Sequence, residues 1–204
     1  YQMLECMYEK HPIRNRIAGT AETVAEITEE TLQRAYACYY TTDEMALVCA
    51  GDIPLGEVRR MAEHVARRET AARVYFPTED AEIAEKYRAC EMRLSVPQFQ
   101  IGCKLPPLPK QDWLKKRMAA GFCMELLAGE SSVFFQKAYE WDWLDEALGS
   151  AFFCGEGYAF AAFSGSGTHP EETADFLGRE LERLQREGFS QEDFQRIRKK
   201  HLGQ

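Results

Sequence analysis

The segment from residue 11 to residue 52 constrains the fold most, because it sets several local structural signals in one order. His11-Pro12 restrains the entry of this segment, and Gly19 permits a bend because it lacks a Cβ atom. Thr28 stands where an N-cap residue is favoured, directly before a helix that we expect over residues 29–40. The segment therefore predicts a tight loop followed by a capped helix.

The chain on either side of this helix carries further signals. Thr20 is expected to cap a short helical turn that begins at Ala21. Residues 45–50 form a short apolar run that ends at Gly51-Asp52, which is typical of a buried strand. Residues 55–69 have the pattern of an amphipathic helix. Its apolar side consists of Val58, Met61, Ala62 and Val65.

The order of these parts resembles the insulinase and pitrilysin family of zinc peptidases, which includes the mitochondrial processing peptidases. In that family a helix is followed by His-Pro, a Gly-Thr turn, an Ile-Thr-x-Glu helix start, an aromatic pair and a strand that ends in Gly-Asp. The corresponding residues here are His11-Pro12, Gly19-Thr20, Ile27-Thr28-Glu29, Tyr39-Tyr40 and Val48 to Asp52. The form HPIRNRIAGT is similar to a bacterial branch whose members are linked to peptide maturation or protein modification.

The zinc-binding motif of active family members does not occur in this sequence. Active members use His-x-x-Glu-His on one helix and a distant Glu on another, so that two imidazoles and a carboxylate hold the metal. The nearest match, residues 60–64, has Arg60 where the first ligand would stand, and a guanidinium does not deprotonate to become a ligand. We therefore expect a solvated helix face there and assign no catalytic and no metal-binding residues; substrate-binding residues stay unassigned.

The resemblance implies that the motif would precede Tyr1, and the uncapped, charged chain ends favour an excised piece. We expect an internal fragment of a larger protein. No cofactor is expected in this chain, and zinc is expected in the parent only if the preceding segment carries the ligands.

Composition narrows the classes of partner. The net charge is -8, from 25 basic and 33 acidic residues, which argues against nucleic acid. No apolar run stands out as long enough for a bilayer span, so no membrane segment is expected. The seven cysteines form no Cys-x-x-Cys pair and no spacing typical of zinc, which favours reduced thiols and a cytoplasmic location.

The remainder of the chain predicts strands and helices in alternating groups. Residues 69–85 lose periodicity and contain Pro77, so we expect a linker there, with a boundary near residue 80. Strands are expected over residues 86–94, 98–104, 150–154 and 158–165. Helices are expected over residues 113–127, after Ser131 or Ser132, and over residues 173–187 and 192–200.

Three features have two interpretations each. Ser131 or Ser132 either caps a helix or acts as a nucleophile. Capping is favoured, because the sequence has no Gly-x-Ser-x-Gly elbow around either serine. His169 is expected in a loop, because no second ligand lies near it in sequence for a metal. A set of strand aromatics fills a core or lines a peptide-binding wall. These are Phe152, Phe153, Tyr158, Phe160 and Phe163.

Together these elements predict an α+β fold of two layers, with a mostly antiparallel sheet covered by helices. The resemblance implies metallohydrolase-like half-domains of the insulinase and pitrilysin family. Residues 1–78 would be the C-terminal part of the first αβ half-domain, and residues 79–204 the N-terminal and central part of the second.

The resemblance implies a non-catalytic internal portion of a zinc-dependent endopeptidase-like protein that acts on peptides. This portion would contribute to a chamber wall and to contacts with substrate or partner. Its partners would be the remaining half-domains of the same protein or a homologous subunit. The alternatives are a part of a non-catalytic partner subunit, serving recognition and assembly, and a general protein-interaction module.

The ligand inventory yields a first prediction. The purified chain, incubated with zinc and repurified, should carry no stoichiometric zinc by elemental analysis and should cut no unstructured peptide, because the ligand set is missing. A zinc-stimulated cut that survives repurification would contradict it.

Overall fold

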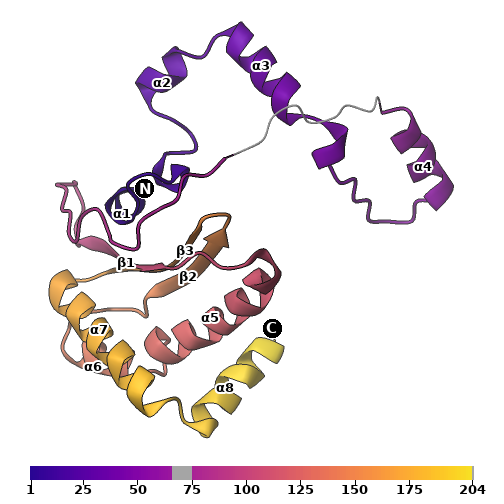
Figure 1. Cartoon of the computed structure of the whole chain (residues 1–204). Coiled ribbons are helices and arrows are strands. Elements are labelled where there is room, and N and C mark those ends of the chain that lie inside the picture. The colour runs from indigo at the N-terminus through magenta and orange to yellow at the C-terminus, as the bar shows by residue number, and fades with distance from the viewer. Residues whose placement is uncertain (66–74, 204) are drawn as a thin grey trace. The chain divides into compact units, whose positions relative to one another are not determined.

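The computed structural model describes residues 1–65 and 75–203, which fall into two units (Figure 1). The sheet unit comprises Tyr1–Asn15 and Phe76–Gln204, and the helical unit comprises Arg16–Tyr75. The predicted boundary between family half-domains at residue 78 concerns a longer protein and stays a prediction.

The sheet unit is built on three antiparallel strands in the order β1-β3-β2. They are β1 (Gln98–Leu105), β2 (Gly149–Gly155) and β3 (Tyr158–Ser166). Ile101 lies opposite Phe163 in the β1–β3 pair, and Phe153 lies opposite Phe160 in the β2–β3 hairpin. These strands confirm the expectations for residues 98–104, 150–154 and 158–165.

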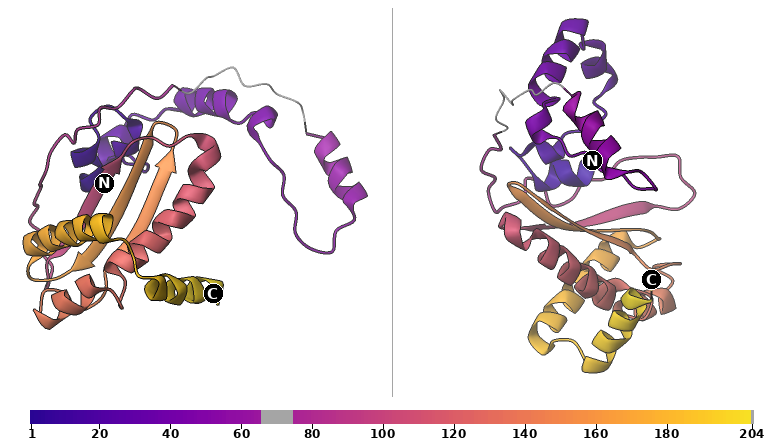
Figure 2. Two further views of the ribbon diagram at one scale, coloured as in Figure 1. Left: turned by 60° about the horizontal axis from the view of Figure 1, so that its bottom comes forward. Right: turned by 90° about the vertical axis from the view of Figure 1, so that its right-hand side faces the viewer.

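Four helices lie on one side of this sheet (Figure 2), and the last of them packs against the first rather than on the strands. They are α5 (Trp113–Ala128), α6 (Val133–Glu140), α7 (Pro170–Glu187) and α8 (Gln191–Leu202), with the 3-10 turn η3 (Lys110–Asp112) before α5. The core between helices and sheet contains Met124, Leu127, Phe134, Leu144, Phe163 and Phe176. The predicted α+β architecture with a helix-covered antiparallel sheet is confirmed.

A short helix, α1 (Gln2–Met7), lies on the opposite face of the sheet, and the turn η1 (Pro12–Arg14) follows it (Figure 1). Because side chains alternate along a strand, β3 directs Phe163 to the large helices and Phe160 to α1. Gly102 permits the close approach of α1, since a Cβ atom there would lie 2.7 Å from the sulfur of Met7.

The helical unit contains α2 (Ala21–Ala25), α3 (Glu29–Tyr39), the turn η2 (Thr42–Glu44) and α4 (Leu55–Glu63). Both predicted caps are confirmed. The hydroxyl of Thr20 accepts from the Thr23 amide at 3.3 Å, and that of Thr28 accepts from the Thr31 amide at 3.2 Å. The expected extension of α4 over residues 66–69 lies outside the described residues.

Two predicted strands are wrong. Residues 45–50 and 86–94 form neither helix nor strand, and Val48 and Met92 are 85% and 69% exposed. A strand persists only where a neighbour takes up its backbone N–H and C=O groups. Within the described residues, the sheet has three strands and neither segment joins it. An apolar run in the sequence does not by itself specify which strand it will pair with.

One stretch, Lys110–Glu140, is long and apolar enough for a membrane span by length and composition, contrary to the sequence-based expectation. The stretch is not one continuous helix, because α5 ends at Ala128 and Ser132 caps α6. Met124 and Phe134 from its two helices are buried in the core of the sheet unit. Packing against the sheet accounts for part of this apolar character, while Leu114 and Met118 of α5 stay exposed.

A pair of glycines tests the packing at the end of β3. A Cβ atom on Gly167 would collide with the carbonyl oxygen of Trp143, whereas a Cβ atom on Gly178, inside α7, would meet nothing within 4 Å. Gly167→Ala should lower the free energy of unfolding by about 1–3 kcal/mol. Gly178→Ala, the control, should raise it by about 1 kcal/mol because alanine favours helix. Urea unfolding of both variants measures this, and equal effects would contradict the packing.

Candidate functional site

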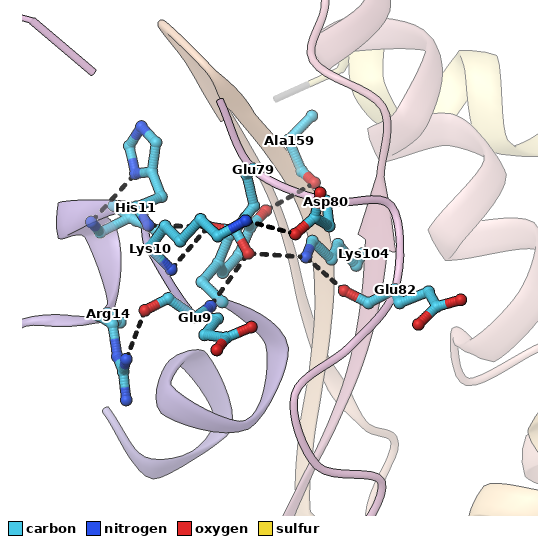
Figure 3. Close-up of polar contacts among 11 residues, drawn as sticks. Glu9, Lys10, His11, Arg14, Glu79, Asp80, Glu82, Lys104 and Ala159 are labelled. Carbon is cyan, nitrogen blue, oxygen red and sulfur yellow. Dashed lines mark hydrogen bonds and ion pairs between the residues drawn. The ribbon is translucent and has the colours of Figure 1, made fainter. Parts of the chain in front are cut away.

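The carboxylate of Glu79 receives three backbone amides from the chain that follows α1 (Figure 3). The amide of Glu9 donates at 3.0 Å, that of Lys10 at 2.9 Å and that of His11 at 2.7 Å. α1 ends at Met7 and Tyr8 is extended, so these amides have no helical partner of their own. Glu79 thus serves as a cap supplied from 68 to 70 residues further along the chain.

Lys104 of β1 completes the charge balance of this carboxylate. Its ammonium lies 3.2 Å from Oε1 of Glu79 and donates to the backbone oxygen of Glu82 at 2.6 Å. It also lies 4.9 Å from the centre of the Tyr8 ring, which is a cation–π contact. The two charged side chains are only 6% and 4% exposed, so each depends on the other in a desolvated setting.

Burial and hydrogen bonding act in opposite directions on this carboxyl. Desolvation by itself raises the pKa of Glu79, but the amides of Glu9, Lys10 and His11 and the ammonium of Lys104 stabilise the carboxylate and lower its pKa to about 2. Burial raises the pKa of Tyr8 to about 12, and the Tyr8 hydroxyl donates to the carbonyl of Ala159 at 3.0 Å.

His11 joins the same corner to the turn between β2 and β3. Its Nδ1 accepts from the amide of Ile13 at 3.1 Å, and its Nε2 donates to the carbonyl of Glu156 at 3.0 Å. The ring is 1% exposed and stacks on Phe76, with centroids 5.1 Å apart. Because both nitrogens are engaged, the imidazole is not free to bind a metal.

We call this constellation the Glu79 clamp. It consists of Tyr8, the residues 9–11, Glu79 and Lys104. The clamp ties the end of α1, the chain before β1, and the sheet together, and the groups named here satisfy one another. The linker was expected over residues 69–85; of these, the structure describes residues 75–85, and Glu79 fastens this part to the end of α1 and to β1. The arrangement holds structure in place and offers no reactive group.

His64 and His169 each have local contacts with neighbouring residues. His64 follows α4, where its Nδ1 lies 2.6 Å from the carbonyl oxygen of Arg60 on an exposed face. His169 is exposed before α7, with its Nδ1 2.8 Å from the Thr168 hydroxyl. Across residues 1–65 and 75–203, no three His, Cys, Asp or Glu side chains are grouped so that they could hold a metal ion.

The two serines have structural contacts. Ser132 caps α6 by accepting from the Phe135 amide at 3.0 Å, as predicted, and Ser131 accepts from Arg196. A hollow of about 420 Å³ lies beside them, between the α5–α6 turn and the α7–α8 turn. Charged residues that line it pair with one another, including Arg183 with Glu187 at 2.9 Å.

The strand aromatics divide between the two faces. Phe163 is buried under the helices, and Phe160 is buried against α1, which confirms the core interpretation for both. Phe153 stacks on Phe160 with centroids 4.9 Å apart, yet it stays 45% exposed on β2. Only this part of the sheet keeps an aromatic side chain open to another molecule.

Sequence reasoning missed Glu79 and Lys104. The available signal was that Lys104 is the one charged residue in the strand Gln98–Leu105, on a face that alternation places under α1. A buried lysine requires a partner, and that partner comes from a segment with no periodic pattern.

A helix-covered antiparallel sheet, with the buried ionic groups beside α1 engaged in structure, defines an α+β domain. Residues 26–200 match the family described as Peptidase M16 inactive domain. The chain belongs to this family, which confirms the resemblance to the insulinase and pitrilysin peptidases.

Two relatives are considerably longer than this chain. It is 27% identical, over 210 residues, to a protein named uncharacterized zinc protease YmfH from Bacillus subtilis (strain 168), and covers 49% of that protein. A crystal structure of an M16-like peptidase from Alicyclobacillus acidocaldarius superposes with a TM-score of 0.88 at 26% identity, over 99% of this chain and 49% of the other. The chain thus spans about half the length of these relatives.

The clamp predicts a specific response to acid. The pKa of Glu79 falls from 4.5 to about 2 on folding, so the folded state binds this proton more weakly than the unfolded state. The resulting stability, about 3 kcal/mol, is complete above pH 4.5 and lost as the pH falls towards 2. Glu79→Gln should therefore be less stable than the unsubstituted chain at pH 7, by about this amount, and the difference should shrink below pH 4.5.

Urea unfolding followed by tryptophan fluorescence measures this difference, because Trp113, Trp141 and Trp143 all lie in the sheet unit. Glu82→Gln is the matched control: Lys104 contacts only the backbone of Glu82, and this residue is exposed. A constant gap between the Glu79→Gln variant and the unsubstituted chain from pH 7 to pH 2 would contradict the assignment.

Proposed function

We propose that this chain is a non-catalytic portion of a zinc-dependent endopeptidase-like protein that acts on peptides. In this role it contributes to the wall of a substrate chamber and to contacts with substrate or with a partner half. The observation that carries the proposal is the match of residues 26–200 to the Peptidase M16 inactive domain. The name zinc protease borne by the Bacillus relative supports a peptidase as the whole protein.

The geometry supports a wall rather than a reaction centre. The Glu79 clamp and the buried side chains of Met7 and Phe160 cover one face of the sheet at β1 and β3. β2 lies at an edge of the described sheet, with Phe153 exposed beside it. An edge strand with an open aromatic side chain can contact an extended polypeptide by main-chain pairing.

The residues of this chain do not fit the zinc of the family. His11 uses both ring nitrogens in hydrogen bonds, and Arg60 stands at the first position of the nearest motif-like stretch. Zinc belongs to the proposed whole protein only where another segment supplies its ligands.

A non-catalytic partner subunit, which serves recognition and assembly, is the second candidate, because the same domain fits a protein that lacks zinc ligands altogether.

We also propose a cytoplasmic, reducing location. Its support is the sequence pattern of the seven cysteines, and burial raises the pKa of the Cys103 thiol, which makes that group less reactive.

The test uses the purified whole protein with an unstructured peptide. We expect cleavage that a chelator abolishes and added zinc restores, while the isolated 204-residue chain stays inactive under the same conditions. A whole protein that cleaves only after a homologous subunit is added would favour the partner role. Chelator-sensitive cleavage by the isolated chain would overturn the proposal.

A photoreactive peptide bound to the whole protein tests the wall itself. Labelled residues should fall within the sheet unit, and Phe153→Ala should reduce labelling. Ala substitution of Leu114, which is 73% exposed on α5 and thus on the helix-covered side, is the matched control. Labelling that avoids the sheet unit entirely would exclude the wall.

A further inference from the structure

The hollow of about 420 Å³ between the α5–α6 turn and the α7–α8 turn lies wholly within the sheet unit. Its volume falls in the range of about 300–1,000 Å³ that is typical of ligand sites. Part of its lining is apolar, and Val133 and Phe189 there are 46% and 40% exposed. The rest includes charged side chains and the hydroxyl groups of serines. Such a lining suits a ligand with an aliphatic part and a polar end.

Glu180 of α7 is the charged side chain of this lining that is most removed from water, at 10% exposure. Its Oε2 accepts from Nε of Arg183 at 3.0 Å and from Nη2 of the same residue at 2.9 Å. No hydrogen bond from a described residue reaches its Oε1. A carboxylate accepts through both oxygens, and burial of a charge is costly when its compensation is incomplete. Glu180 therefore retains an oxygen for one further donor.

The two guanidinium groups of the lining already have partners. Arg183 also donates to Glu187 at 2.9 Å, and Arg196 donates to Asp193 at 2.9 Å and to Ser131. The three carboxylates of the lining exceed its two guanidinium groups by one negative charge. A hollow lined by such an excess attracts a positive charge.

Two helix N-termini border the hollow, and a helix N-terminus by itself favours an anion. Both are capped from within the chain: Ser132 accepts from the Phe135 amide at 3.0 Å, and Ser190 accepts from the Asp193 amide at 3.0 Å. The C-terminus of α7, at Gly188, contributes the negative end of its macrodipole. Because donors are engaged and an acceptor oxygen stays open, the hollow favours a cation over an anion.

The shape of the open acceptor distinguishes between two kinds of cation. A guanidinium pairs best with both oxygens of one carboxylate, and Oε2 of Glu180 is already engaged by Arg183. An ammonium is a compact charge that can donate to a single oxygen. The geometry at Glu180 thus suits an ammonium group better than a guanidinium group.

We propose that this hollow binds an alkylammonium group, as carried by a lysine side chain or by a free aliphatic amine. The ammonium donates to Oε1 of Glu180, and the methylene stem lies against Val133, Leu184 and Phe189. The site goes beyond the proposed function, because it uses only residues of the sheet unit and requires no peptidase activity.

An NMR titration of the 204-residue chain tests the site. The probe is Nα-acetyl-lysine methylamide, and the norleucine counterpart keeps an aliphatic side chain but lacks the ammonium. The lysine probe should shift the amide signals of Ser132, Glu180 and Gly188 and bind at least about tenfold more tightly than the norleucine compound, because a charge-assisted hydrogen bond is added. The arginine counterpart should bind more weakly than the lysine probe. Equal binding of all three compounds, or of none, would overturn the proposal.

A matched pair of variants on α7 assigns the charge. Glu180→Gln should weaken binding of the lysine probe at least about tenfold, because the charged acceptor is lost. Glu182→Gln removes the same charge from an exposed position outside the lining and should leave binding unchanged. Equal affinity in these two variants would overturn the site.

A second pair leaves Glu180 and Arg183 untouched, so the test stays decisive if Glu180→Gln fails to fold. Val133→Lys places a positive charge at an exposed part of the lining and should abolish binding of the lysine probe. Val133→Gln, of similar length but neutral, should retain it. Unchanged binding in both variants would contradict the site.

Competition distinguishes the two sources of the ammonium. An unstructured peptide with one central lysine and the free amine 1,4-diaminobutane each compete with the lysine probe. Displacement at a lower concentration of the peptide would assign the site to polypeptides, and the reverse order would assign it to a free amine. Failure of both to displace the probe would overturn the proposal.

Discussion

The buried ion pair between Glu79 and Lys104 is the interaction on which the arrangement of the sheet unit depends. Two charges taken out of water are stable only when each is fully compensated. Three amides and one ammonium compensate Glu79, while Glu82 and the Tyr8 ring take the remaining contacts of Lys104. Breaking any one of the contacts to Glu79 leaves a charge or an amide unsatisfied, so the clamp adds to the apolar contacts that hold α1 on the sheet.

The clamp also explains how the sheet carries helices on both faces. The large core under α5 to α8 stabilises one face, and the clamp stabilises the other. The ionisable groups that are buried near α1, namely Glu79, Lys104, Tyr8 and His11, are saturated with structural hydrogen bonds. A catalytic group needs a free lone pair or proton directed at a substrate. These four groups therefore serve the structure of this domain.

The two units contrast in how they satisfy apolar side chains. The sheet unit buries Phe134, Phe163 and Phe176 within itself, whereas the helical unit leaves Val48 and Met61 in solvent. Such a difference is expected when one unit contains its own core and the other supplies one layer of a core shared with another polypeptide. Membership of the Peptidase M16 inactive domain family and the greater length of the relatives are consistent with that division of roles.

The sequence by itself determined the local elements: the caps at Thr20, Thr28 and Ser132, the β2–β3 hairpin and the helices around the core follow from periodicity and capping chemistry. The order of motifs from His11 onward also determined the family. Tertiary structure alone decided which apolar runs become strands, because residues 45–50 and 98–104 both have a strand pattern and, within the described residues, only the second pairs with a neighbouring strand. The tertiary structure alone also determined that the Glu79 clamp forms. The partners of that carboxylate come from parts of the chain with no common sequence pattern, and they meet only when α1 docks on the sheet.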